Sequence, residues 1–200
     1  MSDDAPPVTD PTGIMTGGGL GRALGRVPRS ARWILPAVAA AFAGTETSAI
    51  GQRERALLIL RVASIERSPY LRTQIEGVAG DLGLTEDEIT LVESDEWETA
   101  AFDDRERAAI LWGDRVARRL ARRDRVAYEG VRAVFDEDAF VELTMIASLA
   151  AMHVRIANAL RIVPEPPTEL APRARPISDD MFRAWNASMF DDHAHKEVAS

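Results

Sequence analysis

The chain has 200 residues, 46% of them hydrophobic, which suffices for one domain with a core and two tails. It has no cysteine, which excludes disulfides, thiol peroxidase chemistry and cysteine-bound metals. A formal charge of -8 argues against general nucleic-acid binding, which needs a basic surface. The early apolar run of residues 33–43 is too short to span a membrane, so we expect a soluble, cytoplasmic protein without a membrane partner.

The composition divides the chain into three parts. Residues 1–27 are rich in glycine, proline and aspartate and show no sustained period, which predicts a mobile arm. Residues 28–163 carry the apolar helical patterns and form the predicted domain, while residues 164–200 form a proline-rich linker, a last helix over 179–190 and a tail. His193 and His195 lie beside carboxylates in that tail, but a chain end rarely holds three ligands in place, so neither a metal site nor a cofactor is expected.

Helical periods and capping residues predict an all-α fold. In chain order we expect helices over about residues 30–42, 53–65, 69–82, 85–92, 103–120, 124–135 and 137–161. The second of these has almost no polar face and should be buried on most sides. Ser68, Thr85, Asp103 and Asp136 are placed to cap helices, and Gly83 is placed to end one.

Residues 66–69 form a short polar break between two of these helices. Ser68 stands at an N-cap position and Pro69 at the first helical position, so the N–H groups and positive dipole end of the next helix face the break. Arg67 and Arg72 flank it, and this combination favours an anion. The other interpretation is a capped surface turn with two solvated arginines.

Three segments in this order resemble the carboxymuconolactone decarboxylase and alkyl hydroperoxidase D superfamily. They are residues 53–76, FDDRERAAILWGDRVA (102–117) and FVELTMIASLAAMHVRIANAL (140–160), and the resemblance spans roughly residues 30–163. It implies an all-helical fold and a homo-oligomer, whether dimer, trimer or hexamer. The peroxidase branch of that family carries a glutamate, a Cys-x-x-Cys pair and a histidine, at the positions that are Ala56, Ser68, Leu71 and Ile75 here.

The missing residues exclude thiol peroxidase activity. A related branch without cysteines has a glutamate at the position of Leu71 and keeps the histidine, and this chain departs from that pattern too. The residues that remain similar to the family are Arg61, Tyr70, Gln74, Asp114, Glu142, Arg155 and Asn158. Any catalysis would therefore depend on fixed polar side chains rather than on redox sulfur.

Three side chains are candidate catalytic groups. Tyr70 could donate a hydrogen bond to an enolate or carboxylate oxygen, or pack under the loop. His153 lies on a predicted core helix, where a neutral imidazole could move a proton or simply be satisfied within the packing. Glu142 is a second candidate for proton transfer, although it could also form a buried ion pair.

The candidate substrate-binding residues are mostly cationic. Arg61, Arg155 and Glu142 are expected to form a buried ion-pair network, and the arginines would become carboxylate clamps only if that network borders a cavity. Asp114 could pair with Arg61 or Arg155. The arginines of residues 115–125 form a solvated face or an oligomer contact rather than a nucleic-acid site. The full binding set comprises Arg61, Arg67, Ser68, Arg72, Gln74, Trp112 and Arg155.

Two functions of different classes follow from these residues and from what the resemblance implies. The first is a cofactor-independent lyase or isomerase acting on a small anionic or carbonyl-bearing molecule. The second is a non-catalytic scaffold or small-molecule-binding protein that kept the fold and lost the chemistry. The two are distinguished by whether a pocket reachable by solvent opens at Ser68, Tyr70 and Gln74.

Overall fold

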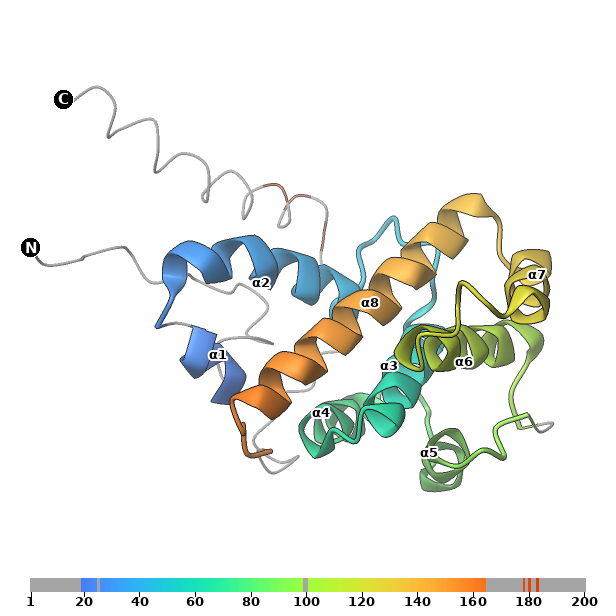
Figure 1. Cartoon of the computed structure of the whole chain (residues 1–200), viewed down its shortest axis with the longest axis horizontal. Coiled ribbons are helices and arrows are strands. Elements are labelled where there is room, and N and C mark those ends of the chain that lie inside the picture. Colours follow the sequence, from blue (N-terminus) through green and yellow to red (C-terminus); the bar gives the residue numbers. More distant parts are fainter. Residues whose placement is uncertain are drawn as a thin grey trace, which may run out of the picture.

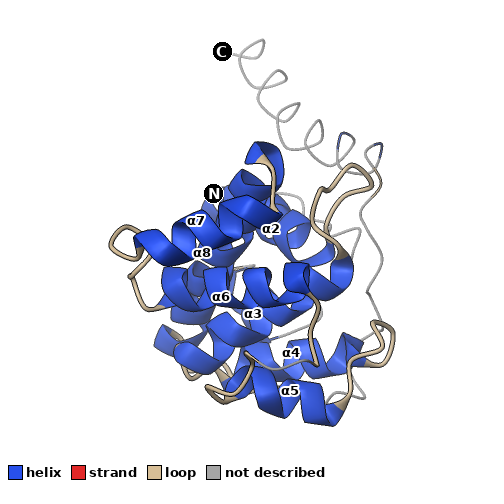
Figure 2. Ribbon diagram, turned by 90° about the vertical axis from the view of Figure 1, so that its right-hand side faces the viewer, coloured by secondary structure: helices blue, strands red, loops and turns tan. Residues whose placement is uncertain are grey.

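The computed structural model describes residues 19–24, 26–98 and 101–164, together with the single positions 178, 180 and 183. Within these residues the chain forms helices and no strand (Figure 1, Figure 2), which confirms the all-α prediction. The predicted helix over 179–190 falls almost wholly outside the described residues, as do His193 and His195. The helices are α1 (Gly19–Leu24), α2 (Pro28–Ala43), α3 (Gln52–Ile65), α4 (Pro69–Ala79), α5 (Glu86–Glu93), α6 (Asp104–Ala117), α7 (Arg125–Val134) and α8 (Glu137–Ala159).

Helix α3 is the centre of the fold. It packs against α2, α4, α5, α6 and α8, and each residue from Arg55 to Ala63 is buried. Such burial agrees with the sequence of this helix, which has almost no polar face after its first turn. The two arginines inside the run, Arg55 and Arg61, therefore need partners within the protein.

Helix α8 runs along the molecule from α7 at one end to α1 at the other (Figure 1). Among the described helices it is the one long and apolar enough to cross a membrane, judged by length and composition. However, Leu143, Ala147, Ala150 and Val154 are fully buried, and the helix packs against α2, α3 and α6. Its apolar composition is accounted for by its place in the core.

A glycine allows α6 to approach α3 closely. A Cβ atom at Gly113 would lie 2.9 Å from the backbone oxygen of Leu58, which is shorter than real Cβ contacts. Glycine at this position therefore sets the spacing between the two helices that share the most extensive contact in the fold.

The capping predictions are confirmed at four helix starts. The side-chain oxygens of Ser68, Thr85, Asp103 and Asp136 each accept a hydrogen bond from a backbone N–H three residues later. The end of α4 differs from the prediction, because the helix stops at Ala79 and Gly83 adopts its positive φ of 64° in the following turn.

Helix α1 lies inside the segment that was predicted to be an arm. Leu20 and Leu24 are one turn apart and both are buried, in a cluster with Val38 and Tyr70. Their shared apolar face explains why this short segment packs on the domain rather than extending from it. Residues 1–18 lie outside the described part of the chain.

Candidate functional site

The break between α3 and α4 is a tight, capped turn. Arg67 adopts a left-handed conformation with φ of 53°, and the Ser68 N–H donates to the Ala63 carbonyl at 2.9 Å. The Ser68 hydroxyl accepts from the Leu71 N–H at 3.3 Å and is buried. The serine therefore serves the backbone of α4, as its N-cap position predicted.

The two arginines beside the break have different surroundings. The Arg67 side chain is exposed. Arg72 contacts the carboxylates of Glu76 and Glu93, both at 2.5 Å, and that of Glu86 at 3.8 Å. The hydrogen bond to Glu93 raises the pKa of Arg72, although burial opposes the shift. Since acidic side chains of α4 and α5 balance Arg72, the positive field expected at the break is much reduced.

The positions that carry reactive groups in the peroxidase branch are closed to solvent. Ala56, Ser68, Leu71 and Ile75 are each no more than 4% exposed. The three hydrocarbon side chains belong to the main hydrophobic core. Gln74, on the same helix, is partly buried. Ala56, Leu71 and Ile75 therefore fill space in the core of the described part of the chain.

Tyr70 and His153 meet beside this turn. Their rings stack with centroids 5.8 Å apart and planes 19° apart, and the Phe42 ring lies 5.0 Å from the imidazole. Both Tyr70 and His153 are 4% exposed. Burial lowers the pKa of His153 from 6.5 to about 4, so the imidazole is neutral at neutral pH. Its Nε2 atom has no hydrogen-bond partner among the described residues.

Arg61 holds three elements together. Its Nε and Nη2 atoms donate to Asp114 Oδ1 at 2.9 and 2.7 Å, and Nη2 also donates to Asp95 at 2.7 Å. Nη1 donates to the Val92 and Ser94 carbonyls at 2.9 and 2.7 Å. Every N–H group of the guanidinium thus has an acceptor on α5, α6 or the loop between them, and none is left for a substrate.

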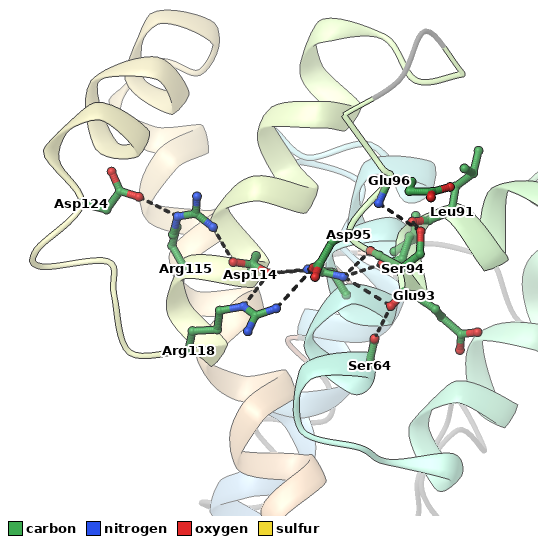
Figure 3. Close-up of polar contacts among 12 residues, drawn as sticks. Ser64, Leu91, Glu93, Ser94, Asp95, Glu96, Asp114, Arg115, Arg118 and Asp124 are labelled. Atoms are coloured by element: carbon green, nitrogen blue, oxygen red, sulfur yellow. Dashed lines mark hydrogen bonds and ion pairs between the residues drawn. The ribbon is translucent and has the colours of Figure 1, made fainter.

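Asp114 is the shared acceptor of this cluster. Figure 3 shows the side chains of Arg115 and Arg118 converging on it. Arg115 Nη1 lies 2.5 Å from Asp114 Oδ2, and Arg118 Nε lies 3.0 Å from Asp114 Oδ1. Burial would raise its pKa, but the hydrogen bonds from Arg118 and Arg61 outweigh this and lower it. The arginine-dense segment after Trp112 therefore contributes two of its cations to a buried carboxylate.

Glu142 and Arg155 occupy two further, separate ion pairs. Glu142 pairs with the buried Arg55 at 2.7 Å and accepts from the Ala49 N–H at 2.8 Å and from the Ser48 hydroxyl. Burial acts to raise the pKa of Glu142, and these hydrogen bonds bring it below its usual value. Arg155 donates to Glu66 at the end of α3, with Nε 3.1 Å from the carboxylate.

The candidate residues thus form several local contacts instead of the single network expected. Tyr70 stacks on His153, whereas Arg61, Glu142 and Arg155 pair with different carboxylates or arginines: Asp114 and Asp95, Arg55, and Glu66. Sequence reasoning missed Arg55, the buried partner of Glu142, although its place in an apolar helix six residues before Arg61 was a signal of the same kind.

Trp112 lies away from the break. Its indole N–H donates to the Thr144 hydroxyl at 2.9 Å, and its ring borders a pocket of about 660 Å³ between α6, α7 and α8. Tyr128, Phe140 and Thr144, which share this pocket, were not among the residues predicted for a site. The four-residue spacing of Phe140 and Thr144 on α8 places them on one face, but nothing in the sequence joins that face to Trp112.

No known family model and no curated protein matches the sequence. Solved structures do share its fold. One is a protein of unknown function from Agrobacterium tumefaciens, suggested to be an antioxidant defence protein AhpD. It is 22% identical, with a TM-score of 0.63, over 72% of this chain and 95% of that chain.

Two further structures are uncharacterized peroxidase-related proteins. The one from Ralstonia eutropha JMP134, described as an alkylhydroperoxidase AhpD core, is 13% identical with a TM-score of 0.65 over 80% of this chain and 83% of that chain. The one from Silicibacter sp. TM1040 is 17% identical with a TM-score of 0.64 over 82% of this chain and 95% of that chain. The chain therefore has the alkylhydroperoxidase D fold, as its resemblance to that superfamily predicted, and has no cysteine.

Proposed function

We propose that this protein is a non-catalytic scaffold that uses the alkylhydroperoxidase D fold to assemble into homo-oligomers in the cytoplasm. One observation carries the proposal: Ala56, Ser68, Leu71 and Ile75, at the positions of the family's reactive groups, are buried core residues. The hydrocarbon of Ala56, Leu71 and Ile75 supports the packing of α3 and α4, and the Ser68 hydroxyl caps α4, so these positions offer no free reactive group to a substrate.

A second candidate is the cofactor-independent lyase or isomerase. The contact that favours it is the stacking of Tyr70 on His153, whose Nε2 atom lacks a hydrogen-bond partner within the described part of the chain. A neutral imidazole beside a phenol can move a proton and polarise an oxygen. Both rings are almost completely buried, and Tyr70 belongs to an apolar cluster with residues of α1, α2 and α8. A substrate would have to displace part of this packing to reach either ring, so the scaffold has the better support.

Turnover measurements distinguish these two functions. The purified protein is incubated with a library of small carboxylates and lactones, and products are followed by mass spectrometry. The scaffold predicts no turnover that depends on Tyr70 or His153. A product formed by the wild type and lost in both Tyr70→Phe and His153→Leu would overturn the scaffold and establish the lyase or isomerase.

The outer face of α8 supports the assembly part of the proposal. Val141 and Met145 lie one turn apart on this helix and are more than half exposed. Apolar side chains grouped on one helix face are typical of contacts between subunits. A second copy of the chain would cover them, and the resemblance implies such an oligomer.

Light scattering after size exclusion measures the assembly. We expect an oligomer for the wild type and a smaller species for Val141→Glu, because a carboxylate buried at an interface costs several kcal/mol. Val163→Glu is the matched control, since Val163 is exposed beyond the end of α8. A wild type that is monomeric, or a Val141→Glu variant that keeps the wild-type mass, would contradict the assembly.

A further inference from the structure

The pocket between α6, α7 and α8 lies on the opposite side of the core from the α3–α4 turn. It has a volume of about 660 Å³, and its lining residues come from α6, the loop that follows α6, α7 and the first turns of α8. Figure 1 shows these helices at one end of the molecule. A volume of this size suits a small organic molecule, since ligand pockets commonly span about 300–1,000 Å³. None of the ion pairs that hold α3 in place lines it.

Three aromatic rings form the apolar wall of the pocket. Trp112 and Phe140 have centroids 4.8 Å apart, and Tyr128 meets the Phe140 ring edge-on at 5.4 Å. Trp112 is almost completely buried, whereas Tyr128 is 44% exposed, so the wall extends from the core to the solvent. Such a wall offers both ring faces and ring edges to a planar guest.

A threonine fixes the orientation of this wall. The Thr144 hydroxyl accepts from the Trp112 indole N–H at 2.9 Å and donates to the Phe140 carbonyl at 2.8 Å. Its hydrogen-bonding capacity is thus largely used within the protein. Thr144 is therefore a positioning residue that holds the indole ring, and the polar recognition of a guest falls to other side chains.

Positive charge collects at the rim. Arg122 is exposed and has no carboxylate partner among the described residues, whereas Arg125 pairs with Glu129 at 2.6 Å. Arg132 does not line the pocket, but its guanidinium lies over the Phe140 ring, with 5.3 Å between Cζ and the ring centroid. Two arginines, Arg122 and Arg125, and one glutamate, Glu129, line the pocket, so its rim carries a net positive charge on a chain whose formal charge is -8.

We propose that this pocket binds a small planar aromatic carboxylate. The aromatic ring of the guest packs against Trp112, Phe140 and Tyr128, and its carboxylate meets the Arg122 guanidinium. A guanidinium matches a carboxylate with two parallel hydrogen bonds, and the uncompensated charge of Arg122 makes an anion preferable to a neutral guest. This binding goes beyond the scaffold function and does not depend on Tyr70, His153 or the oligomer.

The test uses 2-naphthoate as the probe and isothermal titration calorimetry on the full chain. We expect saturable binding to the wild type and an affinity at least tenfold lower for Arg122→Gln. Arg123→Gln is the matched control, because Arg123 is exposed on the same loop and does not line the pocket. Its affinity for 2-naphthoate should stay within twofold of the wild type.

A neutral analogue tests the contribution of the carboxylate to the affinity separately from that of the aromatic ring. Naphthalen-2-ylmethanol should bind the wild type more weakly than 2-naphthoate and should be insensitive to Arg122→Gln. Tyr128→Ala should weaken both compounds, because it removes part of the aromatic wall. Circular dichroism of each variant checks that the helical fold is intact.

Three results would overturn the proposal. The first is the absence of saturable binding with 2-naphthoate at concentrations up to about 1 mM. A dissociation constant above this value would be too weak for a specific pocket. The second is an equal loss for Arg122→Gln and Arg123→Gln, which would mean diffuse attraction to the arginine-rich loop. The third combines two observations: the wild type does not bind 2-naphthoate, and Tyr128→Ala dissociates the wild-type oligomer. Together they would mean that a second copy of the chain fills the pocket.

Discussion

Replacing His153 by leucine should remove a pH-dependent part of the stability of this fold. In the folded protein, burial among Phe42, Tyr70 and their neighbours lowers the pKa of the imidazole from 6.5 to about 4. The unfolded chain binds the proton at its ordinary pKa, so between these two values unfolding takes up a proton and acid favours the unfolded state. Above pH 6.5 His153 is neutral in both states and has no proton-linked effect, and the destabilisation that it causes grows as the pH falls from 6.5 to about 4.

The expected size of the effect follows from the shift. A difference of one pKa unit corresponds to about 1.4 kcal/mol, so the interval from 6.5 to about 4 gives a loss of about 3 kcal/mol. Leucine has a similar volume and does not titrate. At neutral pH His153→Leu should be neutral or slightly stabilising, because it removes a buried Nε2 atom that has no partner among the described residues.

Urea unfolding followed by circular dichroism at fixed pH values between 7.5 and 4 measures the effect. The stability of the variant relative to the wild type should rise by about 3 kcal/mol as the pH falls. His193, His195 and the carboxylates are common to both proteins, so their titration cancels in the difference. Parallel stability profiles for the two proteins would refute the reasoning, because the imidazole would then titrate alike in both states.

Two further pairs of substitutions test the packing of α3. Asp114 and Asp95 both contact the same buried guanidinium at 2.7 Å, but their side chains are 2% and 85% exposed. In urea unfolding, Asp114→Asn should therefore lower the free energy of unfolding by about 3 kcal/mol and Asp95→Asn by less than about 1 kcal/mol. Equal losses would mean that burial does not decide the strength of these ion pairs. Gly113→Ala should destabilise by about 1–3 kcal/mol, because its Cβ would meet the Leu58 carbonyl. Gly130→Ala on α7 is the control, because a Cβ there meets nothing within 4 Å. It should raise the melting temperature, since alanine favours the helix by about 0.5–1 kcal/mol. A stabilising Gly113→Ala would contradict the close approach of α6 to α3.

Local patterns predicted most of the fold correctly. The capping side chains of Ser68, Thr85 and Asp103 bond to N–H groups three residues later, so neighbouring residues alone decide where these helices begin. The end of α4 was placed too late, at Gly83 instead of Ala79, because a glycine serves equally well in the turn after a helix. Helix α1 was missed because its few apolar residues show no sustained period.

The candidate site was predicted only in part. The sequence placed Tyr70 and His153 in one site, and their rings do stack. It treated Arg61, Glu142 and Arg155 as one network, whereas the fold gives each its own partner. A charge inside an apolar helix signals that a partner must exist, but it does not identify the partner.

What the sequence determined by itself is the all-helical architecture, the burial of α3 and the absence of redox sulfur. These properties follow from residue types and from spacings of three or four residues. Only the tertiary structure decided that Arg61 meets Asp114 and Arg55 meets Glu142, across 53 and 87 residues of sequence. The tertiary structure also buries the positions of the family's reactive groups and brings the aromatic residues of the pocket together. The physical reason is that such contacts depend on how whole helices pack, which no local pattern records.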